Sequence, residues 1–329
     1  MDNLDEFYPM ETLVQKVLQK NKRAIAKAIS LVENQPSACE QFIQKIFPYT
    51  GKAFVVGTTG PPGSGKSTLI NNVALEFRKR GKTVGIIAVD PTSPFSGGAL
   101  LGDRIRMDEL SSDPGVFIRS MGSRGSLGGL SRATIDAIRI LDAAGYDIIL
   151  VETVGAGQSE VEIVRTAHTT IVIGIPGTGD AVQAIKAGIL EIADIYVVNK
   201  SDRPGADEIA RELKLLLTLD PMAKDKTRWQ VSVISTSCIP PISGITKLTD
   251  MIMNHQLFLQ DPKNKDFALE AEMKRRKNEI HEIIKVEIFE NMLTSLIGKQ
   301  KWEKILKDVI DKKIDPYSAA RSIMDPLFR

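Results

Sequence analysis

The sequence predicts an α/β fold in which a doubly wound, mostly parallel sheet forms the centre and helical segments form both ends. Two observations support this prediction. Between residues 51 and 250, short apolar runs rich in β-branched residues alternate with amphipathic stretches, as strands and helices do in such sheets. All of the 25 glycines except Gly298 lie between Gly51 and Gly244, so the turn-rich part of the chain is its centre.

Seven apolar runs in this centre predict strands, at residues 53–59, 83–90, 116–120, 147–153, 169–176, 194–200 and 230–236. Most of them are apolar on both faces, which is typical of parallel strands that are covered on each side. Amphipathic stretches predict helices at 66–80, 127–144, 180–191 and 205–219. Ligands of such sheets bind at the carboxyl ends of the strands, so the polar residues at those ends are the candidates for a functional site.

The two flanks predict helices rather than strands. We expect an N-terminal helical segment over residues 1–50, a central domain over 51–260 and a C-terminal helical arm over 261–329. The first segment predicts two short helices with a break near Asn21. The arm carries one apolar stripe at helical spacing, formed by Ile280, Ile283, Ile284, Ile288, Met292 and Leu296. This stripe packs either on the central domain or, as a dimerisation arm, on a second copy of the chain.

Composition narrows the class of protein further. The chain has 329 residues, of which 43% are hydrophobic, as in ordinary globular proteins. Its net charge of +2 gives no electrostatic case for nucleic acid as a partner. No stretch approaches ~18 uninterrupted apolar residues, so we expect no transmembrane helix and no membrane partner. The acidic start is unlike a signal peptide and the two cysteines are far apart, so we expect a cytoplasmic protein.

A glycine-rich loop follows the first predicted strand and precedes a predicted helix. Its sequence is GPPGSGKS, and such loops turn consecutive backbone N–H groups toward phosphates at the positive end of a helix dipole. In this arrangement Lys66 reaches the β- and γ-phosphates of a nucleotide, and the Ser67 hydroxyl binds Mg²⁺. The predicted nucleotide-binding residues here are Gly60, Pro61, Pro62, Gly63, Ser64, Gly65, Lys66, Ser67 and Thr68.

The second motif, NKSD, stands at the end of a later strand and comprises Asn199, Lys200 and Asp202. The pattern NKxD is typical of guanine recognition in P-loop GTPases, because a carboxylate accepts hydrogen bonds from N1–H and the N2 amino group of guanine. Adenine lacks this donor pair, so such a site discriminates strongly. The loop Ser235–Thr236–Ser237–Cys238 after the last strand either closes over the base or is an ordinary polar turn, and its candidate residues are Ser235, Ser237 and Cys238.

Carboxylates at two other strand ends are candidates for the metal and the attacking water. Glu152 ends the run DIILVE, where an aspartate commonly binds the metal, and its longer side chain suits contact with Mg²⁺ through a water. Gly155, three positions after Glu152, offers its backbone N–H to the γ-phosphate. Asp90 ends another strand, and Asp103 lies in GALLGDRIRM. A helix cap or a solvated turn is the structural alternative for each carboxylate.

At these residues the sequence resembles the MeaB/ArgK group of P-loop GTPases, whose mitochondrial relative is MMAA. The segments that carry the likeness are VDPTSPFSGGALLGDRIRM (89–107), SMGSRGSLGGLSRAT (120–134), VETVGAGQSE (151–160) and PGTGDAVQAIKAGILEIADIYVVNKSD (176–202). The likeness runs from about Leu13 to Asp261. One departure is STSCIPPISGI, which leaves the base-closing residue open.

The resemblance implies a homodimeric, GTP-hydrolysing chaperone that gates adenosylcobalamin loading and reactivation of an acyl-CoA mutase of the methylmalonyl-CoA type. It implies GTP or GDP and Mg²⁺ as ligands. Lys66, Asp90, Glu152 and Gly155 are then the predicted catalytic residues. Ser67, Asp90, Asp103 and Glu152 are the predicted metal ligands. Gln183 and Lys186 match a switch loop that responds to the mutase.

Three other functions remain as alternatives. A nickel metallochaperone GTPase shares the glutamate, but such proteins usually carry His-rich tracts or Cys–His pairs that this sequence lacks. A kinase linked to amino-acid transport needs an acceptor pocket, whereas the guanine motif and the glycine-rich loops favour hydrolysis. A nucleotide-dependent scaffold without catalysis is the third alternative.

Overall fold

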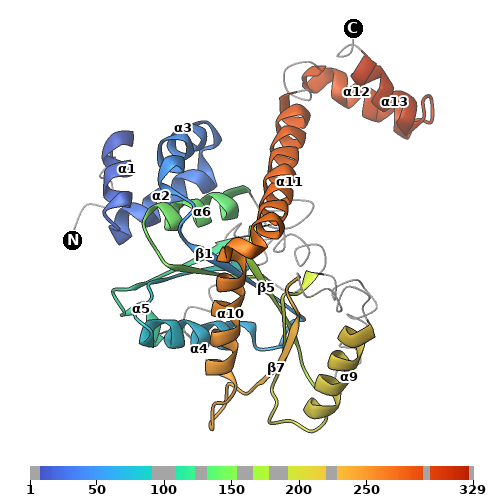
Figure 1. The fold of residues 1–329 in the computed structure, drawn as a ribbon. Coiled ribbons are helices and arrows are strands. Elements are labelled where there is room, and N and C mark those ends of the chain that lie inside the picture. The colour runs from blue at the N-terminus through green and yellow to red at the C-terminus, as the bar shows by residue number, and fades with distance from the viewer. Residues whose placement is uncertain are drawn as a thin grey trace. The chain divides into compact units, whose positions relative to one another are not determined.

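The computed structural model describes residues 8–90, 108–122, 132–153, 166–177, 192–219, 228–291 and 297–325 (Figure 1). Contacts between residues divide the chain into two compact units, Met1–Leu269 and Glu270–Arg329. The predicted domain boundaries after residues 50 and 260 stay predictions. In the described part of the chain, no helix is both long and apolar enough to cross a membrane.

The first unit is built on a seven-stranded parallel sheet in the order β3-β2-β4-β1-β5-β6-β7. This confirms the predicted doubly wound sheet. The strands are β1 (Phe54–Thr59), β2 (Val84–Asp90), β3 (Val116–Gly122), β4 (Ile148–Glu152), β5 (Thr169–Gly174), β6 (Ile195–Asn199) and β7 (Ser232–Thr236). The register pairs Glu152 with Thr58 on one side and with Ala88 on the other, so the carboxyl ends of β1, β2 and β4 are level.

Helices cover both faces of this sheet (Figure 1). On one face, α4 (Lys66–Lys79) and α10 (Ile245–Gln260) bury Phe77 and Leu248 against Val56 and Ile86. The other face has two covering groups. The first comprises α1 (Met10–Leu18), α2 (Lys22–Asn34), α3 (Pro36–Ile46) and α6 (Arg132–Ala143). The second is α9 (Ala206–Leu219), which packs on β6 and β7. Two short elements, α5 (Asp108–Ser111) and the 3₁₀ turn η1 (Phe47–Tyr49), complete the described helices before α10.

The predicted break near Asn21 is confirmed. Helix α1 ends at Leu18, and the side chain of Asn21 caps α2 by accepting a hydrogen bond from the backbone N–H of Ala24 at 3.0 Å. Between the helices, the Lys20 ammonium donates to the Gly145 carbonyl at 2.7 Å and lies over the Tyr146 ring. Burial lowers the pKa of Lys20. The N-terminal segment is thereby held at the amino end of the sheet.

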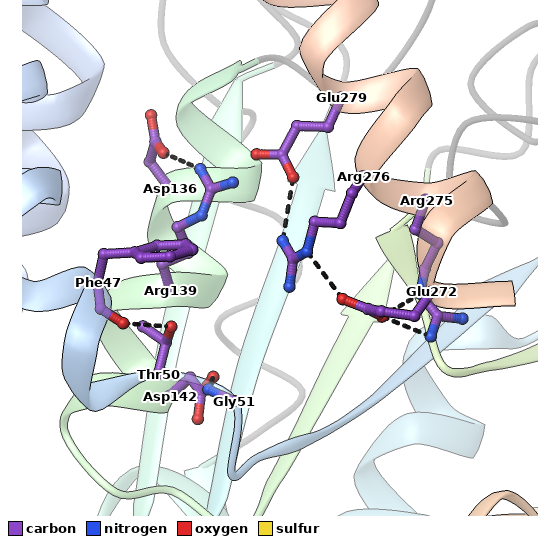
Figure 2. Close-up of polar contacts among 10 residues, drawn as sticks. All are labelled: Phe47, Thr50, Gly51, Asp136, Arg139, Asp142, Glu272, Arg275, Arg276 and Glu279. Carbon is purple, nitrogen blue, oxygen red and sulfur yellow. Dashed lines mark hydrogen bonds and ion pairs between the residues drawn. The ribbon is translucent and has the colours of Figure 1, made fainter. Parts of the chain in front are cut away.

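The turn that leads into β1 is held by α6. The Asp142 carboxylate accepts a hydrogen bond from the backbone N–H of Gly51 at 2.5 Å (Figure 2). It also accepts from the backbone N–H groups of Lys52 and Ala53, at 3.0 and 2.8 Å. The Thr50 hydroxyl donates to the carbonyl of Phe47 at 2.8 Å, which closes η1. Three donors on one carboxylate set the starting position of β1 and hence of the loop that follows it.

The second unit contains most of α11 (Lys265–Asn291), together with α12 (Gly298–Ile310) and α13 (Pro316–Met324). Within α11, Arg276 bonds to Glu272 at 2.8 Å and to Glu279 at 3.1 Å (Figure 2). The predicted helical character is confirmed for the described residues of the arm. Ile280 and Ile284 of the predicted stripe are about half-exposed, whereas the side chains of 286–296 lie outside the described set.

Candidate functional site

The glycine-rich loop joins the end of β1 to the start of α4, as the sequence predicts. Gly60, Gly63 and Gly65 have φ angles of 151°, 74° and 86°, which lie in the left-handed region that favours glycine. A Cβ atom at Gly60 would lie 2.5 Å from the carbonyl oxygen of Ile173, and one at Gly65 would lie 2.6 Å from Nδ2 of Asn199. The loop therefore needs glycine at both positions.

The lysine and the serine of this loop face different partners. Lys66 is buried, and its Nζ donates to the carbonyl oxygens of Gly60 at 2.9 Å and Pro61 at 3.2 Å. The Ser67 hydroxyl donates to Oε1 of Glu152 at 2.7 Å. A positive charge and a hydroxyl–carboxylate pair are thus gathered at the first turn of α4. This arrangement suits a phosphate group and its counter-cation.

Glu152 is the last residue of β4 and is buried next to β1 and β2. Asp90 ends β2, where its backbone pairs with Gly122, but its side chain lies outside the described set. Asp103, Gly155, Gln183 and Lys186 also lie outside the described residues. Among the residues that are described, no group of three or more His, Cys, Asp and Glu side chains is placed to hold a metal ion.

The NKSD motif contacts the phosphate loop directly. Nδ2 of Asn199 donates to the carbonyl oxygen of Ser64 at 2.7 Å, and the Lys200 ammonium donates to that of Gly63 at 2.7 Å. Lys200 adopts a φ of 57°, which turns its side chain back toward the loop. Two of the predicted base-reading residues are therefore joined to the predicted phosphate-binding residues, although 135 positions separate Asn199 from Ser64.

The loop after β7 reaches the same place. The Ser237 hydroxyl donates to Oδ1 of Asp202 at 2.8 Å, and the Cys238 sulfur lies 3.7 Å from Oδ1 of Asn199. Burial raises the pKa of Cys238 to about 11, and the Asp202 carboxylate adds to this shift, so the thiol stays protonated at neutral pH. Ser235 lies within β7, where its carbonyl oxygen faces Gly244. Its role at the base stays a prediction.

Thr236 lies in the loop that the sequence predicts to close over the base, but no role of its own was predicted for it. It is fully buried, and its hydroxyl donates to Oδ1 of Asn199 at 3.0 Å. Because Oδ1 accepts from Thr236, the amide of Asn199 is oriented with Nδ2 toward Ser64. The only signal in the sequence is a threonine at a strand end, and a hydroxyl there is too common to indicate a role.

Comparison with known proteins relates the chain to one family. The family described as "Methylmalonyl Co-A mutase-associated GTPase MeaB" matches residues 25–297. A Pyrococcus horikoshii protein named "Putative GTPase" is 49% identical over 319 residues, which cover 97% of this chain and 98% of that protein. The GTPase ArgK of Escherichia coli is 35% identical over 251 residues, which cover 75% of this chain and 76% of ArgK.

A mitochondrial relative and a solved structure extend the comparison. The mouse protein named "Methylmalonic aciduria type A homolog, mitochondrial" is 38% identical over 261 residues, which cover 73% of this chain and 61% of the mouse protein. A crystal structure described as an LAO/AO transport system kinase matches over the full length of both chains, with a TM-score of 0.71 and 24% identity. At that identity the structural likeness concerns the fold alone.

Proposed function

The chain belongs to the MeaB family of methylmalonyl-CoA mutase-associated GTPases, and we propose that it binds and hydrolyses GTP in the service of an acyl-CoA mutase. The hydrogen bond from Asn199 to Ser64 is the observation that carries the nucleotide assignment. It makes the NKSD motif and the glycine-rich loop parts of one site. A guanine nucleotide fits this site with its base edge at Asp202 and its phosphates along Gly60–Ser67.

The residues present fit Mg²⁺ as the counter-ion of the phosphates. Ser67 and Glu152 bring a hydroxyl and a carboxylate oxygen within 2.7 Å of each other, and hard oxygen donors are the ligands that Mg²⁺ prefers. We propose that these two residues hold the ion together with Asp90 and Asp103. When bound, Mg²⁺ neutralises charge on the phosphates.

The chain's own residues then supply positioning and charge for hydrolysis. In the proposed reaction, the Lys66 ammonium leaves the Gly60 and Pro61 carbonyls to bind the β- and γ-phosphates. The N–H of Gly155 binds the γ-phosphate, and a carboxylate at Asp90 or Glu152 orients the attacking water. Lys66→Ala should abolish hydrolysis, and retained turnover would contradict this role.

Guanine selection is tested at Asp202. Exchanging Asp202 for Asn replaces one acceptor oxygen of the carboxylate by an NH₂ donor. This donor cannot pair with the N1–H and N2 amino groups of guanine, which are donors themselves. GTP affinity should fall at least about tenfold, and affinity for the xanthosine nucleotide should rise. Calorimetric titration measures both, and unchanged GTP affinity would contradict the assignment of the base site.

The proposed client is an adenosylcobalamin-dependent acyl-CoA mutase of the methylmalonyl-CoA type, whose cofactor loading and reactivation the chain gates. The family description and the name of the mouse relative support this proposal. We further propose that Gln183 and Lys186 respond to the mutase. A cytoplasmic location completes the proposal, and the free thiols of Cys39 and Cys238 agree with it.

A pull-down with immobilised methylmalonyl-CoA mutase tests the client. Retention should differ between the GTP- and GDP-loaded chain, and phosphate release should be faster with the mutase than without it. A chain that is not retained in either state, and whose turnover the mutase leaves unchanged, would overturn the client but not the GTPase. Transfer of phosphate to an acceptor, without release of inorganic phosphate, would favour the kinase alternative.

The proposed homodimer uses the apolar stripe of the C-terminal arm. Ile280 and Ile284 are 54% and 48% exposed, so in a monomer their exchange for Glu is tolerated. In a dimer that buries the stripe, the double variant should become monomeric by light scattering. Leu215→Glu is the matched control, because Leu215 is 62% exposed on α9. A double variant that stays dimeric would exclude the stripe as the main contact.

A further inference from the structure

The residue that follows β4, Thr153, is joined to β1 by two hydrogen bonds. Its backbone N–H donates to the carbonyl oxygen of Thr58 at 3.2 Å, and its side-chain hydroxyl donates to the same oxygen at 3.3 Å. Thr153 and Thr58 are 1% and 2% exposed, so water does not compete for either bond. One carbonyl of β1 therefore holds both the backbone and the side chain of Thr153.

Thr153 directly follows Glu152, the carboxylate that we assign to Mg²⁺. Glu152 is the last residue of β4 and is in register with Thr58 of β1 and Ala88 of β2. The last residue of a strand is supported by the ladder from one direction only, so it opens locally more easily than a residue inside the strand. The two bonds of Thr153 lie on the unsupported side of Glu152 and restrict this opening.

A metal ligand at a strand end needs such a restriction. Oε1 of Glu152 accepts the Ser67 hydroxyl at 2.7 Å, and Mg²⁺ demands near-ideal octahedral geometry from its oxygen ligands. We propose that Thr153 is a positioning residue that fixes the Glu152 carboxylate for the divalent cation. This inference rests on the proposed binding of a guanine nucleotide with Mg²⁺ and adds a residue to that site.

Thr153 acts through Glu152 and is not itself a ligand. Successive side chains along a strand point to opposite faces of the sheet. Glu152 faces Ser67 at the start of α4, whereas the Thr153 hydroxyl is directed at the backbone of β1. Exchange of Thr153 for Val keeps the shape of the side chain and the N–H bond to Thr58, so it removes the hydroxyl bond alone.

The test measures Mn²⁺ binding to the GDP-loaded full chain by electron paramagnetic resonance, with Mn²⁺ as the probe of the divalent-cation site. Removal of a group that orients a metal ligand typically costs about 10–100-fold in metal affinity. Thr153→Val and Thr153→Ala should therefore weaken Mn²⁺ about tenfold, whereas Thr153→Ser, which keeps the hydroxyl, should stay within about threefold of the wild type. GDP affinity without a divalent cation should be the same in all four proteins, because the base and phosphate contacts do not involve Thr153.

Thr249→Val is the matched control. The Thr249 hydroxyl is also buried and donates to the carbonyl of Ile245 at 3.0 Å, within α10. Both valine variants lose one buried bond from a hydroxyl to a carbonyl, so urea unfolding should show similar losses of stability. Only Thr153→Val should weaken Mn²⁺. Wild-type Mn²⁺ affinity in Thr153→Val would overturn the inference, as would an equal loss in Thr249→Val.

Glu152→Gln separates failure of this inference from failure of the proposed function. The exchange removes the charge of the assigned ligand and should weaken Mn²⁺ more than Thr153→Val does. If Glu152→Gln weakens Mn²⁺ and Thr153→Val does not, the metal site stands and the role of Thr153 falls. If GDP binds and Glu152→Gln leaves Mn²⁺ affinity unchanged, the assignment of Glu152 to the metal falls together with the inference. If the wild type binds no guanine nucleotide, the proposed function falls as well.

Discussion

Replacement of Thr236 by Val tests whether a buried hydroxyl orients the base motif. The two side chains have nearly the same shape, so the exchange removes the donor to Oδ1 of Asn199 without leaving a large cavity. Thr236 and Asn199 are at most 2% exposed, so water cannot easily replace the lost bond. The Cys238 thiol, at 3.7 Å from the same oxygen, is a weak substitute.

The magnitude follows from the cost of an unpaired buried acceptor. A buried polar group that loses its partner costs about 1–3 kcal/mol. In the free protein this cost appears as reduced stability. In addition, the Asn199 amide loses the contact that directs Nδ2 to Ser64, so part of the bound population has the wrong amide orientation. We therefore expect the free energy of unfolding to fall by about 1–2 kcal/mol and GDP affinity to fall about tenfold.

Thr249→Val is the matched control for Thr236→Val. Thr249 is also fully buried, but its hydroxyl donates to the carbonyl of Ile245 within α10, away from the nucleotide site. Urea unfolding should show a loss of stability for both variants, whereas only Thr236→Val should weaken GDP in a fluorescence titration. Thr236→Ser, which keeps the hydroxyl, should retain most of the affinity. Wild-type GDP affinity in Thr236→Val would refute the orienting role of this hydroxyl.

Three further predictions concern other parts of the first unit. Gly65→Ala should reduce GDP affinity at least about a hundredfold, because the added Cβ would lie 2.6 Å from Nδ2 of Asn199 and residue 65 has a φ of 86°. Titration measures this affinity, and an undiminished affinity would contradict the loop geometry. Tyr146→Phe should leave the urea midpoint unchanged or raise it, because the buried Tyr146 hydroxyl has no hydrogen-bond partner among the described residues, and a fall of more than about 1 kcal/mol would contradict this. The Arg78 guanidinium donates a hydrogen bond to Asp113 at 2.8 Å and holds the pKa of that carboxyl below its usual value. The ionised Asp113 carboxylate therefore stabilises the folded protein above about pH 4, and this stabilisation is lost as the pH falls through the lowered pKa. Asp113→Asn should therefore lower stability at pH 7 and flatten the acid limb of the stability curve, and parallel acid limbs for variant and wild type would contradict this.

The strands were predictable because each is encoded by its own short run of residues. Apolar runs with β-branched residues mark β1 to β7 to within two residues at each end, and the largest differences are at the end of β3, the end of β5 and the start of β7. The break at Asn21 is equally local, since a cap is a contact between residues three positions apart. Helix α3 and the turn η1 were expected only as part of a helical segment, because Pro36 at the start of α3 also suits a turn.

Residue types at strand ends also identified most of the candidate site. Lys66, Ser67 and Glu152, together with the NKSD motif, were recognisable because phosphate, metal and guanine each require particular groups in a fixed order along the chain. The closure of the loop at residues 237–243 was not predictable, because it is a pairing of the Ser237 and Ser243 backbones that no side-chain pattern marks. The role of Thr236 within the predicted base-closing loop was not predictable either, because its partner Asn199 is 37 positions away.

The sequence by itself determined the kind of sheet, the loop at its edge and the chemical groups that end its strands, because these are properties of neighbouring residues. Only the tertiary structure decided that β1 lies between β4 and β5, that Asn199 bonds to Ser64, and that Ser237 bonds to Asp202. Each of these contacts joins residues that are far apart along the chain, so it exists only after the strands have been ordered. The sequence therefore predicted the chemical groups of the candidate site, whereas the packing of the strands and helices determined which of these groups contact each other.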